Sequence, residues 1–108
     1  MTVITFYQKD GHPIGFRADG HAGYDAYGED IVCAGISVLV QNTINSIEEF
    51  TDQVFTLDMD EGQGLIDFRI TDAVGPEAEL LLRSMILGLQ GIEEQYTKRF
   101  LRCNFKEV

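Results

Sequence analysis

The sequence is poor in the residues that usually hold a metal ion. Its 108 residues include only two cysteines and two histidines. Cys33 and Cys103 lie seventy positions apart, with no Cys-x-x-Cys pair, and only His12 and His21 are available as further ligands. This spacing is not that of a structural zinc site, and a reducing cytosol keeps such thiols free. We therefore expect free thiols and neither a metal nor another cofactor.

Positive charge is also scarce. Eight Lys and Arg residues stand against eighteen Asp and Glu residues, which gives a formal net charge of -10 and an isoelectric point near 4.4. A surface of this sign repels a phosphate backbone and attracts basic proteins. The charge balance excludes nucleic acid as the expected partner.

Long hydrophobic runs are missing as well. The N-terminal residues lack the cationic start and apolar run of a secretory signal. The longest apolar-rich windows, residues 31–40 and 80–89, are interrupted and shorter than the ~20 residues that cross a bilayer. We expect no membrane span and a cytoplasmic location. A chain of this length buries roughly two thirds of its unfolded surface, so residues 1–108 are expected to form a single domain.

The patterns of apolar residues predict an α+β fold. Short β-rich runs at residues 2–8 and 13–18 flank Asp10-Gly11, a strong hairpin signal. Strands are also expected at 52–58, 65–70 and 99–105. Residues 76–96 have a proline at the first helical position and acids in the first turn, which predicts a long helix. The order is ββαββαβ, with two helices packed on one face of a largely antiparallel sheet.

The first predicted helix begins at or just before Asp30 and ends at Phe50. Its apolar positions recur every three to four residues, which is typical of an amphipathic helix. They are Val32, Ile36, Val40, Ile44 and Ile47, with Leu39 and Phe50 on the same side. A glycine-rich segment, residues 19–29, precedes this helix, and a connection of that length in a small domain is often functional.

Cys33 is the leading candidate for chemistry. With Asp30 as the helix cap, Cys33 is the third helical residue, where unpaired amides and the positive end of the helix dipole favour a thiolate. The alternative is a buried, unreactive cysteine. His21, twelve positions upstream, is placed to meet the helix start as the base that a cysteine nucleophile needs, although a loop histidine is also often solvated.

Other polar residues near Cys33 have two interpretations each. Asp25, Glu29 or Asp30 can orient the imidazole, as the third member of a triad does, and Asp30 can instead be only the cap. Ser37 lies one turn after Cys33 on the same helix face. Its hydroxyl can hydrogen-bond the thiol region or the loop, or it can donate to a carbonyl of its own helix. Outside this region, Cys103 is interpreted as a packing residue and His12 as a solvated one.

The stretch from Gly20 to Ser37 closely resembles the signature of the Prp family, the ribosomal-processing cysteine proteases of bacteria. The matching segments are Gly20-His21-Ala22-Gly23-Tyr24-Asp25 and Gly28-Glu29-Asp30-Ile31-Val32-Cys33-Ala34-Gly35-Ile36-Ser37. The signature is a glycine-histidine pair, a cysteine on the next helix and a serine one turn later. Outside residues 20–37 the resemblance is one of length and element pattern.

The resemblance implies a function and a set of roles. The family removes a short N-terminal extension from a large-subunit ribosomal protein, at a site rich in aromatic residues. It implies that Cys33 is the nucleophile and His21 the general base, with Asp30 and Ser37 at the motif's acid and serine positions. Helix amides near Cys33 would stabilise the oxyanion.

The family also forms homodimers. Gly35, Gly88 and Gly91 would let helices approach closely in such a dimer, unless they serve packing against the sheet. An aromatic-binding cleft would be walled by Tyr24 above all, with Tyr27 and Ile31 or Ile36; alternatively, the tyrosines only pin the loop.

Two functions remain open from the sequence. The first is a cysteine endopeptidase that acts on the extension of a basic ribosomal protein. The second is a non-catalytic, acidic ribosome-associated binding or assembly module in which Cys33 is merely buried. Thiol reactivity separates them, because only the first needs Cys33 to react faster than Cys103.

Overall fold

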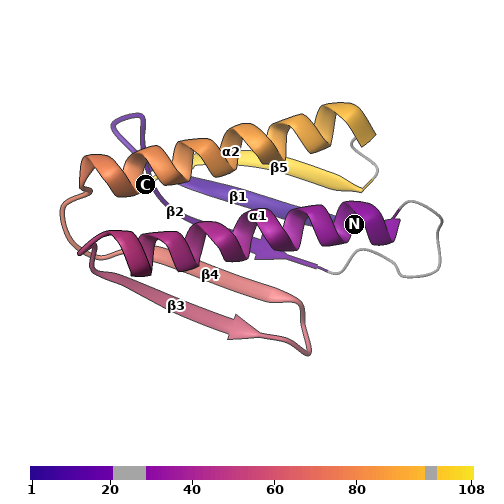
Figure 1. The fold of residues 1–108 in the computed structure, drawn as a ribbon. Helices are drawn as coiled ribbons and strands as arrows, with labels where there is room; N and C mark the ends of the chain where they lie inside the picture. The colour runs from indigo at the N-terminus through magenta and orange to yellow at the C-terminus, as the bar shows by residue number, and fades with distance from the viewer. Residues whose placement is uncertain (21–28, 97–99) are drawn as a thin grey trace.

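The computed structural model describes residues 1–20, 29–96 and 100–108. These residues form helices and strands in the predicted order ββαββαβ (Figure 1). The elements are β1 (Thr2–Lys9), β2 (His12–Asp19), α1 (Glu29–Phe50), β3 (Phe55–Asp60), β4 (Leu65–Ile70), α2 (Pro76–Tyr96) and β5 (Leu101–Glu107). The α+β class is confirmed, and Pro76 is the first helical residue of α2, as its sequence predicts.

The first hairpin turns where the Asp10-Gly11 pair predicts. Lys9 pairs with His12 across the turn, and Asp10 and Gly11 have φ angles of 53° and 80°. Two successive positive φ angles are typical of a type I′ turn, whose twist matches that of the flanking strands. The turn joins β1 to β2, the central strand of the sheet, and the register of the pair shifts by one residue between Tyr7 and Gln8.

The sheet is largely antiparallel, with one parallel pair. Its strand order is β3-β4-β2-β1-β5, and β5 runs parallel to β1 at one edge. The alternation of residues 99–105 predicts a strand but not its direction, because a helical connection can return the chain either way. The strand begins at Leu101 and ends at Glu107, two residues later than predicted.

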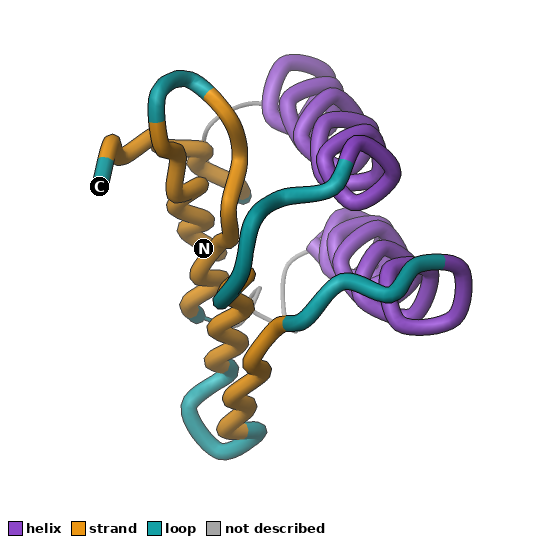
Figure 2. The backbone as a smooth tube through the Cα atoms, turned by 90° about the vertical axis from the view of Figure 1, so that its left-hand side faces the viewer, coloured by secondary structure: helices purple, strands orange, loops and turns teal. Residues whose placement is uncertain are grey.

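Both helices cover one face of the sheet, and among the described elements no helix covers the other face (Figure 2). The predicted apolar stripe of α1 is confirmed as buried: it consists of Val32, Ile36, Val40, Ile44 and Ile47. Beneath the helices, Phe6, Phe16 and Phe68 of three adjacent strands have no exposed surface. The rings of Phe16 and Phe68 stack with centroids 5.4 Å apart. This packing holds α1, and with it Cys33, in a fixed position on the sheet.

Two details at the end of α1 differ from the prediction. Phe50 is 75% exposed and does not continue the buried stripe. The next strand begins at Phe55 rather than at residue 52. The Thr51 hydroxyl donates to the Ile47 carbonyl at 2.6 Å, and the Gln53 amide group donates to the Ala73 carbonyl at 3.0 Å. These hydrogen bonds tie Thr51 to the end of α1 and Gln53 to the segment between β4 and α2, so residues 51–54 form a connection and not the start of a strand.

The three helix glycines, Gly35, Gly88 and Gly91, differ in how closely the other helix approaches them. A Cβ added at Gly88 would lie 3.0 Å from Leu39 of α1, and one added at Gly35 would lie 3.4 Å from Ile92 of α2. Gly88 therefore lets α1 and α2 approach each other within the chain, a role other than packing against the sheet, whereas a Cβ at Gly35 would make only an ordinary contact. A Cβ at Gly91 would meet nothing within 4 Å.

One helix in the described part of the chain is long and apolar enough to cross a membrane. It is Ile31–Phe50, with a mean hydropathy of 1.2. The prediction that every apolar window is too short to cross a membrane is therefore wrong for this helix. The apolar side chains of the helix include the buried stripe that packs on the sheet.

His12 is not simply solvated, as its turn position suggested. Its Nδ1 lies 2.8 Å from Oε1 of Glu79 in the first turn of α2. Arg83 donates to the same carboxylate from one turn later on α2, at 3.0 Å. The contact ties the first hairpin to the helix layer.

Candidate active site

A pocket of about 230 Å³ lies between α1 and the β3–β4 hairpin (residues 55–70). The ends of β1 and β2 close one side of it. The residues that line it are Thr2, Ala18, Gly20, Cys33, Ile36, Ser37, Val40, Gln41, Met59, Asp60, Glu61, Gly64, Leu65 and Ile66. Three of the predicted site residues, Gly20, Cys33 and Ser37, are therefore brought together.

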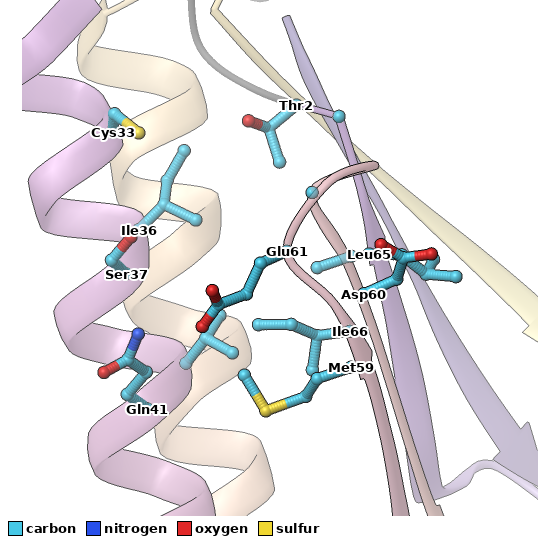
Figure 3. A pocket seen from close by; sticks show the side chains of 14 residues that line it. Thr2, Cys33, Ile36, Ser37, Gln41, Met59, Asp60, Glu61, Leu65 and Ile66 are labelled. Carbon is cyan, nitrogen blue, oxygen red and sulfur yellow. The ribbon is translucent and has the colours of Figure 1, made fainter.

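Cys33 is half-buried in this pocket. Figure 3 shows its side chain on α1, on the same wall as Ile36 and Ser37. Because α1 begins at Glu29, Cys33 is the fifth helical residue and not the third. It lies one turn inside the helix, where the dipole acts more weakly than at the first residues. The evidence that Cys33 is the nucleophile is therefore its place in the pocket and not its distance from the helix start.

Ser37 follows Cys33 by one turn and is exposed on the pocket wall. Among the described residues its hydroxyl has no hydrogen-bond partner. The hydroxyl of Thr43 on the same helix, by contrast, donates to the carbonyl of Leu39 at 2.7 Å. Among the described residues, the Ser37 hydroxyl thus makes no hydrogen bond to a carbonyl of its own helix. It remains available to a molecule in the pocket.

Gly20 closes the pocket next to the β3–β4 turn. Its φ angle is +102°, and a Cβ there would lie 2.6 Å from the carbonyl oxygen of Met1. Its amide donates to the carbonyl of Gly64 at 3.2 Å. Only glycine fits both the backbone angle and the close approach. The structure gives this predicted site residue a mainly architectural role.

We expect Gly20→Ala to lower the free energy of unfolding by at least about 1–3 kcal/mol, because alanine is strained at this φ angle and meets the Met1 carbonyl. Gly91→Ala is the matched control. Its Cβ meets no neighbour, so helix propensity alone should raise stability by roughly 0.5–1 kcal/mol. Urea unfolding of the two variants measures both changes. Equal stability of Gly20→Ala and the parent would contradict the architectural role.

The structure places only part of the remaining predicted residues. His21, Tyr24, Asp25 and Tyr27 lie outside the described residues. Asp30 is the second residue of α1 by its backbone, whereas a cap precedes the first helical residue. The prediction that Asp30 caps the helix is therefore not supported, and its side chain is not described.

The opposite wall of the pocket was missed by the sequence analysis. Asp60 ends β3, and Glu61 and Gly64 come from the β3–β4 turn, which the sequence marks only as a connection. Met59 and Ile66 of the same hairpin supply apolar surface, and Figure 3 shows them facing α1. No local pattern signals these positions, because only the strand order of the sheet brings them to the pocket that Cys33 lines.

Ile36, one of the residues predicted to wall an aromatic-binding cleft, lines the pocket. The alternative wall residue, Ile31, does not line it and is 61% exposed.

Cys103 lies outside this pocket, in different surroundings from Cys33. It lies in β5 and packs against the core, and its backbone amide donates to Oε2 of Glu93 at 2.6 Å. Burial, together with the negative charge of Glu93, raises the pKa of the Cys103 thiol to about 12. Its thiolate is therefore rare near neutral pH, in keeping with a packing role.

No group of three or more His, Cys, Asp or Glu side chains that could hold a metal ion occurs within residues 1–20, 29–96 and 100–108. The pocket offers a thiol, a hydroxyl and carboxylates between apolar walls. A thiol among these groups suits a nucleophilic reaction.

The chain is similar to known proteins over almost its whole length. The family model for cysteine protease Prp matches residues 1–100. A ribosomal processing cysteine protease Prp from Staphylococcus aureus is 39% identical over 106 residues, which cover 98% of this chain and 99% of that protein.

Two crystal structures of Prp from the same organism, an essential ribosomal processing protease, are 34% identical to this chain and have TM-scores of 0.89 and 0.88. Each match covers 98% of this chain and 100% of the other. One of these structures contains a substrate peptide and the other a covalently linked product peptide.

Proposed function

This chain belongs to the Prp family of cysteine proteases, and on that premise we propose that it is an endopeptidase with Cys33 as nucleophile and His21 as general base. The observation that carries the proposal is the pocket of about 230 Å³ lined by Cys33 and Ser37. Both residues belong to the signature at residues 20–37. The other cysteine, Cys103, does not line this pocket.

The reaction is acyl transfer in two steps. His21 takes the proton of the Cys33 thiol, and the sulfur attacks the scissile carbonyl carbon to form a tetrahedral oxyanion. Backbone amides near the start of α1 stabilise that charge. The carbon–nitrogen bond then breaks, and the amine leaves with the proton from His21. Water, deprotonated by His21, hydrolyses the thioester and frees the carboxylate product.

Asp30 and Ser37 support this reaction. We assign Asp30 the role of orienting the His21 imidazole, as the acid of a triad does. Ser37 faces the same pocket one turn from the nucleophile, with its hydroxyl free of partners among the described residues. A hydroxyl in that position can hydrogen-bond the backbone of a bound peptide.

The proposed substrate is the N-terminal extension of a large-subunit ribosomal protein. The relatives from Staphylococcus aureus are ribosomal processing proteases, which supports this class of substrate. Ribosomal proteins are strongly basic, and the net charge of -10 on this chain would speed their encounter. The pocket is smaller than the ~300–1,000 Å³ of typical small-molecule sites, which suits a few side chains of an extended peptide.

The alternative of a non-catalytic ribosome-associated module gains no support from the comparisons, since these relatives are proteases.

We further propose a cytoplasmic homodimer that needs no cofactor. The outer sides of the helices expose Ile31, Val38, Leu80 and Leu87, each more than 60% accessible, which supports a covered helix face. Sedimentation velocity distinguishes a dimer from a monomer.

We expect a thiol-specific reagent such as iodoacetamide to modify Cys33 far faster than Cys103 near neutral pH. A rise in thiol pKa from 9.0 to about 12 lowers the thiolate fraction of Cys103 about 1,000-fold, and thiolate is the reacting species. Peptide mapping by mass spectrometry follows both sites in one sample. Equal, slow labelling of the two cysteines would instead favour the non-catalytic module.

A further inference from the structure

Glu61 is the first residue of the turn that joins β3 to β4, and it lines the pocket that contains Cys33. Figure 3 shows its side chain extending from the hairpin toward α1, at the level between Ser37 and Gln41. The carboxylate thus faces the space where the proposed mechanism needs a peptide to lie.

The two carboxylates at this turn have different surroundings. Asp60 accepts a hydrogen bond from the backbone amide of Gln63 at 3.2 Å, so it stabilises the turn itself. The carboxylate of Glu61 has no hydrogen bond or ion pair with any described residue. Within the described lining of the pocket there is no Lys, Arg or His to neutralise it. Among the residues that the structure describes, Glu61 is therefore a carboxylate without a partner at the edge of the pocket.

The helix provides a scale for the position of this charge. Ser37 and Gln41 follow Cys33 by four and eight residues, which corresponds to about 6 and 12 Å along the helix axis. An extended peptide advances about 3.3 Å per residue. A substrate that runs along α1 from Cys33 therefore brings a residue about two to four positions from the scissile bond opposite Glu61.

We propose that Glu61 is a specificity-determining residue that binds a Lys or Arg side chain of the substrate about two to four residues from the scissile bond. The inference rests on the proposed peptidase function and assigns the kind of side chain that one subsite takes. It goes beyond attraction by net charge, because a charge effect spread over the surface would not depend on one carboxylate or one substrate position.

Peptides that differ only by Lys, Gln or Glu at a single position test the proposal. The variable residue is placed two, three or four positions from the scissile bond on either side. Dissociation constants are measured with the Cys33→Ala variant, so that binding is read without cleavage, and kcat/KM is measured with the active enzyme.

At one or more positions the Lys peptide should bind about 2- to 5-fold more tightly than the Gln peptide, the range of a partly exposed ion pair. Glu61→Gln should bring this ratio close to one, and Glu61→Lys should invert it in favour of the Glu peptide. The ratio should also fall as the salt concentration rises.

Glu48→Gln is the matched control, because it removes the same charge from α1 at a position that does not line this pocket. It should leave the Lys-to-Gln ratio unchanged. A ratio that is the same in the parent and in Glu61→Gln at every position overturns the proposal, as does an equal loss in Glu48→Gln.

The binding and cleavage measurements separate this proposal from the proposed function. A Glu61-dependent preference for Lys without cleavage supports the subsite and contradicts the peptidase. Cleavage without any charge preference supports the peptidase and contradicts the subsite.

Discussion

Cys33→Ala should lower kcat/KM for peptide cleavage by about 10⁴-fold or more, because the acyl-enzyme cannot form without the sulfur and a nucleophile acts as a unit with its base. The fold should be kept, since Cys33 is half-buried at a pocket and the change in volume is small. Cys33→Ser should also be nearly inactive, because a hydroxyl ionises far less readily than a thiol. Cleavage kinetics and circular dichroism together check these expectations.

Cys103→Ala is the matched control for this experiment. It removes the same sulfur atom from a residue that packs against the core and does not line the pocket. This variant should keep its cleavage activity while losing some stability. Cleavage by Cys33→Ala at the parent rate would end the protease proposal.

Replacing the aromatic residues before the scissile bond of the substrate with alanine should lower kcat/KM by about 30- to 150-fold for each ring. Burying one aromatic side chain contributes roughly 2–3 kcal/mol, and part of this energy positions the carbonyl at the nucleophile. Ile36, Met59 and Ile66 supply apolar surface in the pocket. We expect Tyr24, which lies outside the described residues, to complete the wall.

A series of peptides with none, one or both aromatic residues replaced measures this effect. A peptide with conservative aromatic exchanges serves as the control and should retain most of the activity. If the alanine peptide is cut as quickly as the aromatic one, the assigned specificity is wrong, whereas the chemistry of Cys33 and His21 is unaffected.

Local sequence patterns predicted most of the helices, strands and turns, because these elements depend on interactions between residues close together in the chain. The Asp10-Gly11 turn, the buried stripe from Val32 to Ile47 and the start of α2 at Pro76 each depend on residues close together in the chain. The direction of β5 and the start of β3 at Phe55 depend on contacts with distant residues. Periodicity carries no information about such contacts.

The distinction between local and distant contacts also applies to the residues of the site. Cys33 and Ser37 share a pocket wall because a four-residue spacing places them on one helix face, so this part was predictable. Glu61 reaches the pocket only because β4 pairs with β2 and the hairpin tip lies beside α1. Outside residues 20–37 the resemblance is only one of length and element pattern, and it therefore gave no signal for the residues of the opposite wall.

The central claim is that the peptide becomes attached to Cys33 during cleavage. The most direct test is to mix excess enzyme with a peptide substrate, quench the reaction rapidly in acid and map the enzyme by mass spectrometry. We expect the N-terminal fragment of the peptide to be bound to Cys33 as a thioester that hydroxylamine removes. Attachment of the fragment to Cys103 or to another residue, with Cys33 unmodified, would contradict the account.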